Sequence, residues 1–212
     1  MKTPLIGICR HRLATDGKGV TTLVAFHGCP LRCKYCLNAQ CLREDGVWRR
    51  MDALDILNEV MVDDLYFKAT AGGVTFGGGE PLLRSDEIAS FCKLMPAEWH
   101  ISIETSLNVS LRNLQTVAPF VHHYYIDVKD MNPEIYRRYT SISNSLVIDN
   151  LRWLSDHEDP KKVTIRLPHI LDYNTEKDIA ESRKQLEVMG FKDFDCFDYI
   201  IPDEARRYPF SC

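Results

Sequence analysis

Residues 27–36 read His-Gly-Cys-Pro-Leu-Arg-Cys-Lys-Tyr-Cys, and three of the chain's eight cysteines fall within them. The spacing of Cys29, Cys33 and Cys36 is C-x3-C-x2-C. Cubane iron–sulfur clusters usually take four thiolates. Three closely spaced thiolates would therefore bind three irons of a [4Fe–4S] cluster and leave the fourth iron open to a small chelating ligand.

Other interpretations of this loop remain open on spacing alone. A structural zinc site is closed and tetrahedral, so it would need a fourth ligand, for which His27 or Cys41 is available. Three buried cysteines that act as small hydrophobic side chains would also fit the pattern. A disulfide scaffold is disfavoured, because residues 1–10 lack a secretory pattern and the cysteines are clustered.

Outward from the loop, short β-branched apolar runs alternate with segments of helical periodicity. The sequence predicts six strands, at residues 21–26, 73–76, 99–104, 123–129, 162–167 and 197–201. It predicts helices between them at 52–67, 85–95, 111–117, 133–139 with 145–155, and 175–189. Such alternation indicates an α/β fold with a parallel sheet, and right-handed crossovers would curl six units into a partial (β/α)6 barrel.

Several residues are expected to mark helix ends. Ser85 is placed to cap the helix at 85–95, and Pro96 to end it. Asn174 or Thr175 is placed to cap the last long helix, and Gly190 stands where a left-handed residue would follow its end.

Chemically distinctive residues follow every predicted strand. The carboxyl ends of parallel strands meet at one edge of a sheet, where ligands bind in this architecture. In strand order these residues are the cysteine loop, Gly77-Gly78-Gly79-Glu80-Pro81, Glu104-Thr105-Ser106, Asp127 with Lys129, Arg166 with His169, and Asp203 with Glu204. The sequence therefore predicts a single site at this edge.

Each of these groups has a chemical and a structural interpretation. The glycines would leave backbone amides bare for a ligand, and Glu80 or neighbouring carbonyls would accept from a ligand ammonium; a plain strand-to-helix turn is the alternative. Asp127 and Lys129 share a strand face, so they either bind charged ligand groups or pair with each other. Arg166 suits a ligand carboxylate or is a solvated strand end.

Two motifs together carry a family resemblance. The cysteine motif, with Tyr35 before its third cysteine, resembles the signature of the radical S-adenosylmethionine (SAM) superfamily. Gly78-Gly79-Glu80-Pro81 resembles that superfamily's methionine-binding motif. Within the superfamily, residues 22–38, 72–83, 104–105 and 127–129 resemble the glycyl-radical-enzyme activating enzymes of the pyruvate formate-lyase activating enzyme type.

The resemblance implies a partial (β/α)6 barrel and a [4Fe–4S] cluster on Cys29, Cys33 and Cys36. It implies reductive cleavage of SAM to methionine and a 5′-deoxyadenosyl radical, which would abstract a hydrogen atom from a glycine of a partner glycyl radical enzyme. A flavodoxin or ferredoxin-type protein would donate the electron. The alternatives are a radical SAM enzyme that modifies a peptide or a small nucleotide-like metabolite directly, and a non-catalytic zinc or iron–sulfur protein.

The resemblance also implies a role for each residue of the site. Gly78, Gly79 and Glu80 would hold the methionine amino group, Asp127 and Lys129 its polar end, Tyr35 and Asn38 would lie near the adenine, and Thr105 and Arg166 would complete the SAM site. Glu104, Thr105 and Asp127 are the possible ligands of a monovalent cation.

The chain departs from the family pattern in three places. Residues 104–107 read Glu-Thr-Ser-Leu where the family often has acid-Thr-Asn-Gly, and residues 16–19 read Asp-Gly-Lys-Gly where Asp-Gly-Pro-Gly is usual. The family's C-terminal histidine near the cofactor is absent or altered after Ile201. That region helps to shape the substrate end, so the substrate is less defined than the cofactor chemistry.

Length and composition suggest one radical SAM domain over residues 1–212, with its cluster loop at 27–38. A ferredoxin-like insert and a cysteine-rich C-terminal extension are not expected, and Cys9, Cys41, Cys92, Cys196 and Cys212 have no assigned role. A net charge of −4 and a pI of about 6.0 give no broad basic field for nucleic acid. No apolar stretch approaches the roughly 20 residues of a membrane helix. We expect a cytoplasmic enzyme of anaerobic chemistry.

Overall fold

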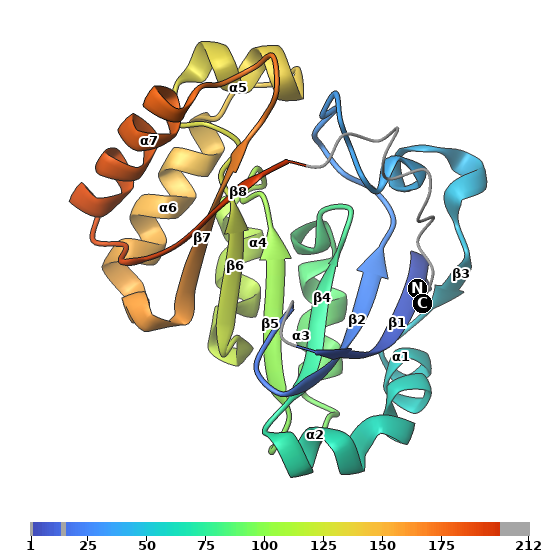
Figure 1. Ribbon diagram of the computed structural model, residues 1–212. Helices are drawn as coiled ribbons and strands as arrows, with labels where there is room; N and C mark the ends of the chain where they lie inside the picture. Colours follow the sequence, from blue (N-terminus) through green and yellow to red (C-terminus); the bar gives the residue numbers. More distant parts are fainter. Residues whose placement is uncertain (1, 14–15, 200–212) are drawn as a thin grey trace.

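An eight-stranded sheet forms the centre of the computed structural model, which describes residues 2–13 and 16–199 (Figure 1). The strand order is β3-β1-β2-β4-β5-β6-β7-β8. Every neighbouring pair from β2 to β8 is parallel, whereas β1 pairs antiparallel with both β2 and β3. The predicted α/β architecture with six parallel strands is therefore confirmed.

The parallel strands are β2 (Val20–Phe26), β4 (Gly73–Gly78), β5 (His100–Thr105), β6 (His123–Asp127), β7 (Val163–His169) and β8 (Asp193–Asp198). Five of them overlap the predicted strands closely. The sixth was predicted at 197–201 but begins four residues earlier, at Asp193. This strand is largely exposed and reads Asp-Phe-Asp-Cys-Phe-Asp, so no buried apolar run marks its start. Residues 200 and 201 of the prediction lie outside the described residues.

The antiparallel strands β1 (Thr3–Leu13) and β3 (Arg49–Met51) were not predicted. The first half of β1 is buried, but the strand continues through Arg10, His11 and Arg12, which obscure its apolar pattern. Arg10 donates to Asp63 at 2.6 and 2.9 Å, and this carboxylate is fully buried. The charged end of β1 is thus stabilised by an ion pair with a residue that is distant in the sequence.

The helices are α1 (Ala53–Val60), α2 (Asp64–Thr70), α3 (Ser85–Cys92), α4 (Leu111–Val117), α5 (Pro133–Thr140), α6 (Ser145–His157) and α7 (Glu176–Val188). The prediction of one helix at 52–67 is wrong, because a short 3-10 turn at Met61–Asp63 separates α1 from α2. That turn places the buried Asp63 against Arg10 and the hydroxyl of Thr22. No helix in the described part of the chain is long and apolar enough to cross a lipid bilayer.

The helix ends agree with the sequence only in part. Thr175 caps α7 in a reciprocal capping box with Asp178, and Gly190 has a positive φ of 102°, as expected. Ser85 does not cap α3, because a 3-10 helix at Pro81–Arg84 leads directly into it and Arg84 takes the cap position. This helix ends at Cys92, ahead of Pro96.

Helices α1, α3, α4 and α6 pack side by side along the sheet (Figure 1). Beneath them, the ring of Phe76 lies 5.8 Å from Phe26 and 5.2 Å from Phe91. Such aromatic contacts add to the free energy gained by burying apolar surface. The packed layer fixes β2, β4 and β5, and their carboxyl ends carry the first part of the site.

Candidate functional site

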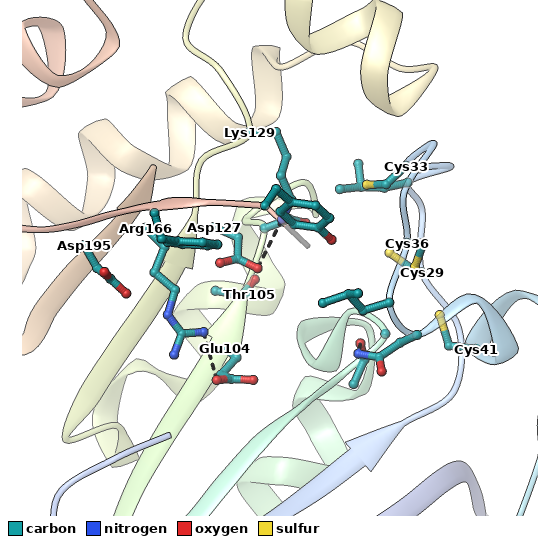
Figure 2. A pocket seen from close by; sticks show the side chains of 18 residues that line it. Cys29, Cys33, Cys36, Cys41, Glu104, Thr105, Asp127, Lys129, Arg166 and Asp195 are labelled. Atoms are coloured by element: carbon teal, nitrogen blue, oxygen red, sulfur yellow. Dashed lines mark hydrogen bonds and ion pairs between the residues drawn. The ribbon is translucent and has the colours of Figure 1, made fainter. Parts of the chain in front are cut away.

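A pocket of about 370 Å³ lies at the carboxyl ends of the parallel strands (Figure 2). Its walls come from the cysteine loop on one side and from the ends of β4, β5, β6, β7 and β8 on the other. Of the predicted ligands of the cluster, SAM and cation, the structure brings all but Tyr35 and Glu80 to this pocket. Those lining the pocket are Cys29, Cys33, Cys36, Asn38, Gly78, Gly79, Glu104, Thr105, Asp127, Lys129 and Arg166.

The cysteine loop has no helix or strand between residues 27 and 38, and backbone hydrogen bonds hold it in place. The amides of Arg32 and Lys34 donate to the carbonyls of Thr140 and Tyr139, at 2.9 and 3.2 Å. These carbonyls belong to the last turn of α5, which has no further helical donors of its own. The loop therefore uses the end of a helix as its support.

A second support comes from the start and end of the loop. The amide of Gly28 donates to the carbonyl of Cys41 at 2.9 Å, and the side chain of Asn38 donates to the carbonyl of Gly78 at 2.9 Å. Asn38 thus ties the loop to the end of β4. The ring of Tyr35 turns away from the pocket toward Tyr139 and Tyr173, and its hydroxyl lies 3.5 Å from a carboxylate oxygen of Asp172.

The three thiols differ in acidity. Burial raises the pKa of Cys29 to about 12 and that of Cys33 to about 11. A hydrogen bond from Cys41 lowers the pKa of Cys36, and the same contact raises the pKa of Cys41. Metal binding requires thiolates and releases their protons, so ligation would charge Cys29 and Cys33 as well.

The chemistry of this donor set fits an iron–sulfur cluster. Thiolates are the ligands that iron–sulfur clusters take, and all three sulfurs line one wall of the pocket. Over residues 2–13 and 16–199, no three His, Cys, Asp or Glu side chains converge on a single metal ion. A cubane takes each thiolate on a separate iron, so it does not require such convergence.

The glycines at the end of β4 are required by close packing, of Gly79 against the cysteine loop and of Gly78 against β2. A Cβ on Gly79 would lie 2.2 Å from the carbonyl oxygen of Gly28, and one on Gly78 would lie 2.8 Å from the Cβ of Ala25. Gly78 also has a φ of 93°. The amide of Glu80 donates to Gly28 at 2.8 Å. The glycine segment is therefore more than a turn. It allows the cysteine loop to pack closely against β4, and Gly78 and Gly79 still line the pocket.

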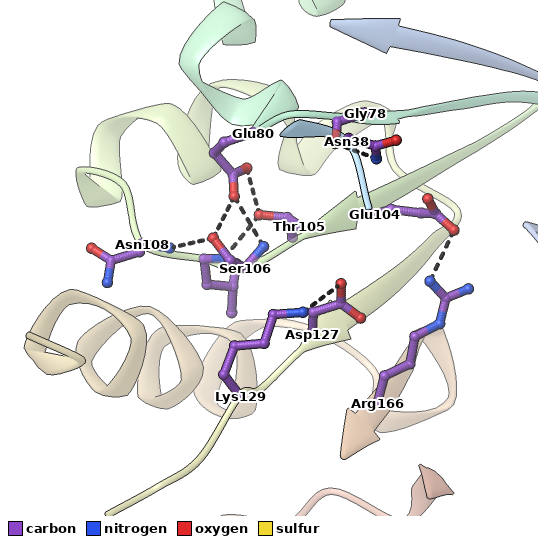
Figure 3. A network of polar contacts seen from close by, with 11 residues as sticks. Asn38, Gly78, Glu80, Glu104, Thr105, Ser106, Asn108, Asp127, Lys129 and Arg166 are labelled. Carbon is purple, nitrogen blue, oxygen red and sulfur yellow. Dashed lines mark hydrogen bonds and ion pairs between the residues drawn. The ribbon is translucent and has the colours of Figure 1, made fainter. Parts of the chain in front are cut away.

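The side chain of Glu80 is buried and directed to protein donors (Figure 3). Its carboxylate accepts from the hydroxyl of Thr105 at 2.7 Å and from the amide and hydroxyl of Ser106 at 2.9 and 2.7 Å. Burial raises the pKa of Glu80, although these hydrogen bonds act to lower it. The predicted acceptor of a ligand ammonium instead joins the end of β4 to the end of β5.

Two ion pairs stand on the wall opposite the thiols (Figure 2). The ammonium of Lys129 lies 3.2 Å from Asp127, and the guanidinium of Arg166 lies 2.9 Å from Glu104. Burial alone would lower the pKa of Lys129, but the charge of Asp127 and its neighbours raises it, so the ammonium stays charged. Burial raises the pKa of Glu104, and Arg166 opposes that shift.

These contacts bear on the predicted cation ligands. Glu104 and Asp127 each face a basic side chain, and Thr105 donates its hydroxyl to Glu80. All three therefore have protein partners already. His169, which the sequence placed at the end of the fifth strand, pairs with Asp198 at 2.9 Å and does not line the pocket.

Sequence analysis missed one strip of the pocket. Asp195, Phe197 and Tyr199 alternate along β8 and just past its end, and all three line the cavity. The ring of Tyr199 lies 5.5 Å from the ammonium of Lys129. The period of two was visible in the sequence, but the strand had been placed four residues too late. Asp203 and Glu204, predicted here, lie outside the described residues.

Comparison with known proteins agrees with the chemistry of the pocket. The Radical SAM superfamily model matches residues 23–186. The (2S)-3-sulfopropanediol dehydratase activating enzyme of Klebsiella oxytoca is 31% identical in a match that covers 79% of this chain and 71% of that protein. The indoleacetate decarboxylase activating enzyme of Tractidigestivibacter scatoligenes is 30% identical over 74% of this chain, and the match spans only 51% of that protein. The pyruvate formate-lyase-activating enzyme of Listeria monocytogenes is 31% identical, over 74% of this chain and 64% of that protein.

Solved structures share the fold at low identity. Coproporphyrinogen III oxidase from Escherichia coli, a radical SAM enzyme, superposes with a TM-score of 0.61 and 18% identity over 93% of this chain and 53% of that one. Streptococcus suis SuiB bound to S-adenosylmethionine gives 0.62 and 14% over 84% and 42%. The partial-barrel prediction is confirmed, as are a [4Fe–4S] cluster and SAM as the cofactors of the family. This chain belongs to the radical SAM superfamily.

Proposed function

We propose that this chain cleaves SAM reductively at a [4Fe–4S] cluster on Cys29, Cys33 and Cys36 and thereby activates a glycyl radical enzyme. One observation supports this most strongly: three thiols and two ion pairs face each other across a single pocket at the strand ends. A cluster with an open iron needs the three thiols. A zwitterionic cofactor that carries a sugar needs the charged side chains of the two ion pairs.

When bound, the cluster and SAM supply a 5′-deoxyadenosyl radical that takes a hydrogen atom from the substrate. The chain's own part is to hold, orient and shield. The loop presents its thiols from a backbone fixed at Thr140, Tyr139 and Cys41. Release of the thiol protons accompanies ligation.

The opposite wall is suited to the charged groups of SAM. Lys129 offers a cation to the methionine carboxylate, and Asp127 offers an acceptor to its ammonium or to a ribose hydroxyl. Since the carboxylate of Glu80 is occupied, the backbone of Gly78 and Gly79 is the part of that motif that would meet the ammonium.

The remaining contacts are proposed from the resemblance. Arg166 and Thr105, which line the pocket from β7 and β5, would complete the SAM site, and Asn38 and Tyr35 would lie near the adenine. Tyr35 would act there only through a change of side-chain position, since its ring now faces Tyr139. A monovalent cation at Glu104, Thr105 and Asp127 would have to displace Lys129 or Arg166 from their partners.

The activase proposal rests on what the related proteins are called. The three relatives compared above are each named as the activating enzyme of another enzyme. We propose the same kind of protein substrate for this chain, an external one-electron donor such as a flavodoxin or ferredoxin, and an anaerobic cytoplasmic setting.

Anaerobically reconstituted protein tests the proposal. It is reduced with dithionite and mixed with SAM, and 5′-deoxyadenosine is measured, with Cys33→Ala as the control. We expect product from the wild type alone. Addition of a glycyl radical enzyme encoded beside this chain should then give a glycyl radical doublet in the electron paramagnetic resonance spectrum. Product without that doublet, but with a modified peptide or metabolite, would exclude the activase function and keep the radical chemistry.

A further inference from the structure

The segment that carries the cysteine motif has the opposite charge to the rest of the chain. Residues 27–50 contain five lysine and arginine residues and two acidic residues, a net charge of +3, whereas the whole chain carries −4. The remaining residues therefore carry −7. A local field of this kind selects partners of opposite charge and speeds their association. A protein that docks at this segment is expected to be acidic.

Three basic side chains in or next to the cysteine loop have no carboxylate partner among the described residues. The ion pairs that residues 27–50 form are Arg43–Asp45 and Arg49–Glu59. Lys34 and Arg32 are exposed, and Arg32 donates only to backbone carbonyls of the loop, which leaves its charge unpaired. Arg84 lies at the start of α3 and close to the loop, since a Cβ on Gly28 would be 3.8 Å from its guanidinium. The buried Nε of Arg84 has no hydrogen-bond partner among the described residues.

The same loop would expose an edge of the cluster. Cys29, Cys33 and Cys36 are each partly exposed, so the group that they hold would lie close to the surface. The other cysteines of the described chain are dispersed over β1, a 3-10 turn at Ala39–Leu42, α3 and β8. Among residues 2–13 and 16–199 that arrangement offers no second cluster. The proposed external donor would therefore deliver its electron at this edge.

We infer that Arg32, Lys34 and Arg84 form a docking surface for an acidic one-electron carrier protein. The inference rests on the proposed function and adds to it the place and the chemistry of the electron donor. In the step concerned, one electron leaves the carrier, which is oxidised by one electron, and enters the cluster, which is reduced by one. No bond forms or breaks, and no proton moves.

The position of these cations favours an electron carrier over the protein substrate. Arg84 belongs to the outer helical layer, whereas the pocket is lined by strand ends and by the inner side of the loop. A substrate has to deliver its reacting carbon into the pocket. A carrier needs only to approach the outer edge of the cluster, where Lys34 and Arg84 lie beside the ligand cysteines.

The test compares protein-delivered with small-molecule reduction of the loaded enzyme. The double variant Lys34→Glu/Arg84→Glu reverses two charges at the loop. Lys177→Glu/Lys184→Glu makes the same change on exposed positions of α7, a helix that lies outside the cysteine loop (Figure 1). Reduced flavodoxin and reduced ferredoxin serve as acidic carriers, and dithionite as the small reductant. The rate of cluster reduction is followed by absorbance at low ionic strength, after iron and sulfide have been matched between samples.

We expect the loop variant to slow reduction by the carriers about tenfold or more, as for steered association, while its rate with dithionite stays within about twofold of wild type. The α7 variant should behave as wild type with all three reductants. Lys34→Arg/Arg84→Lys keeps the charges and should keep the rate. Added salt should slow the wild type and leave the loop variant almost unchanged.

Several results would overturn the docking surface. These are equal slowing in the α7 variant, no slowing in the loop variant, slowing with dithionite as well, or a wild type that neither carrier reduces. Failure of the proposed function looks different, because fully loaded wild type would then make no 5′-deoxyadenosine with dithionite either.

Discussion

The two walls of the pocket are built in different ways (Figure 2). The cysteine wall is an irregular loop, positioned by backbone hydrogen bonds to α5, to Cys41 and to the end of β4. The opposite wall consists of strand ends, and its side chains are held in pairs, Lys129 with Asp127 and Arg166 with Glu104. Loss of a ligand thiol from the first wall should therefore act in an all-or-none manner, whereas other changes around the pocket should act by degrees.

The largest effect is expected at a ligand cysteine. Cys36→Ala removes one of three thiolates, so the cluster loses its proposed attachment and SAM cleavage should fall below detection. Cys92→Ala is the matched control, since Cys92 is a buried thiol on α3 outside the pocket. Iron content and 5′-deoxyadenosine are measured for both. A Cys36→Ala protein that keeps a full cluster would place the ligands elsewhere.

A glycine tests the dependence of the loop on its neighbour. Gly79→Ala would put a Cβ 2.2 Å from the carbonyl oxygen of Gly28, where backbone on both sides has to move. We expect a loss of about 3 kcal/mol or more in the free energy of unfolding, together with poor cluster loading. Urea unfolding of the cluster-free protein gives the first and iron content the second.

Gly28→Ala is the comparison for that experiment. A Cβ on Gly28 meets only a guanidinium nitrogen of Arg84 at 3.8 Å, but Gly28 has a φ of 101°. The cost is therefore backbone strain alone, about 1–2 kcal/mol. If the two variants lose equal stability, the close approach of β4 to the loop is not what selects Gly79.

The buried carboxylate of Glu80 joins the end of β4 to the end of β5, and its replacement should give a pH-dependent effect. Glu80→Gln places an amide among the donors of Thr105 and Ser106, so we expect a loss of about 2 kcal/mol near pH 5. Because burial raises the folded-state pKa above the ordinary 4.5, the stability that the protonated acid contributes is complete below 4.5 and is lost as pH rises through the folded-state pKa. The gap between wild type and variant should therefore narrow from pH 5 to pH 8.

Unfolding in urea at several pH values checks this expectation, with the cluster absent from both proteins. A gap that widens with pH would mean that Glu80 is held as a carboxylate by its donors, with a folded-state pKa below 4.5. That outcome would make its four hydrogen bonds, rather than its burial, the stronger influence.

The sequence was informative where chemistry or periodicity is local. The cysteine spacing, the glycine run and five parallel strands could be predicted, since each depends on neighbouring residues. Long-range contacts could not: the break at Met61–Asp63 exists because Asp63 meets Arg10, and Glu80 is withdrawn from the pocket because Thr105 and Ser106 reach it. No short-range pattern encodes such partners.

Leu107 shows the same limit at a position where the family often has glycine. It has a positive φ of 58°, which costs a non-glycine residue about 1–2 kcal/mol, but its side chain is fully buried. Burying a leucine contributes about 1.5–3 kcal/mol, so packing offsets the strain. A leucine is therefore compatible with the left-handed backbone conformation at this position.

The smallest effect is expected at Tyr35, where the resemblance and the structure differ. Tyr35→Phe removes a hydroxyl that lies 3.5 Å from the exposed Asp172 and keeps the ring against Tyr139 and Tyr173. Stability should change by less than about 0.5 kcal/mol, and the Kd for SAM by less than about twofold. Isothermal titration of the cluster-loaded proteins measures the affinity. Asn38→Ala serves as the contrast, because Asn38 lines the pocket and holds the loop to Gly78, so its loss should weaken SAM binding more. A Tyr35→Phe protein that binds SAM tenfold more weakly would show that the phenol turns into the pocket when the cofactor binds, and would make the loop wall movable.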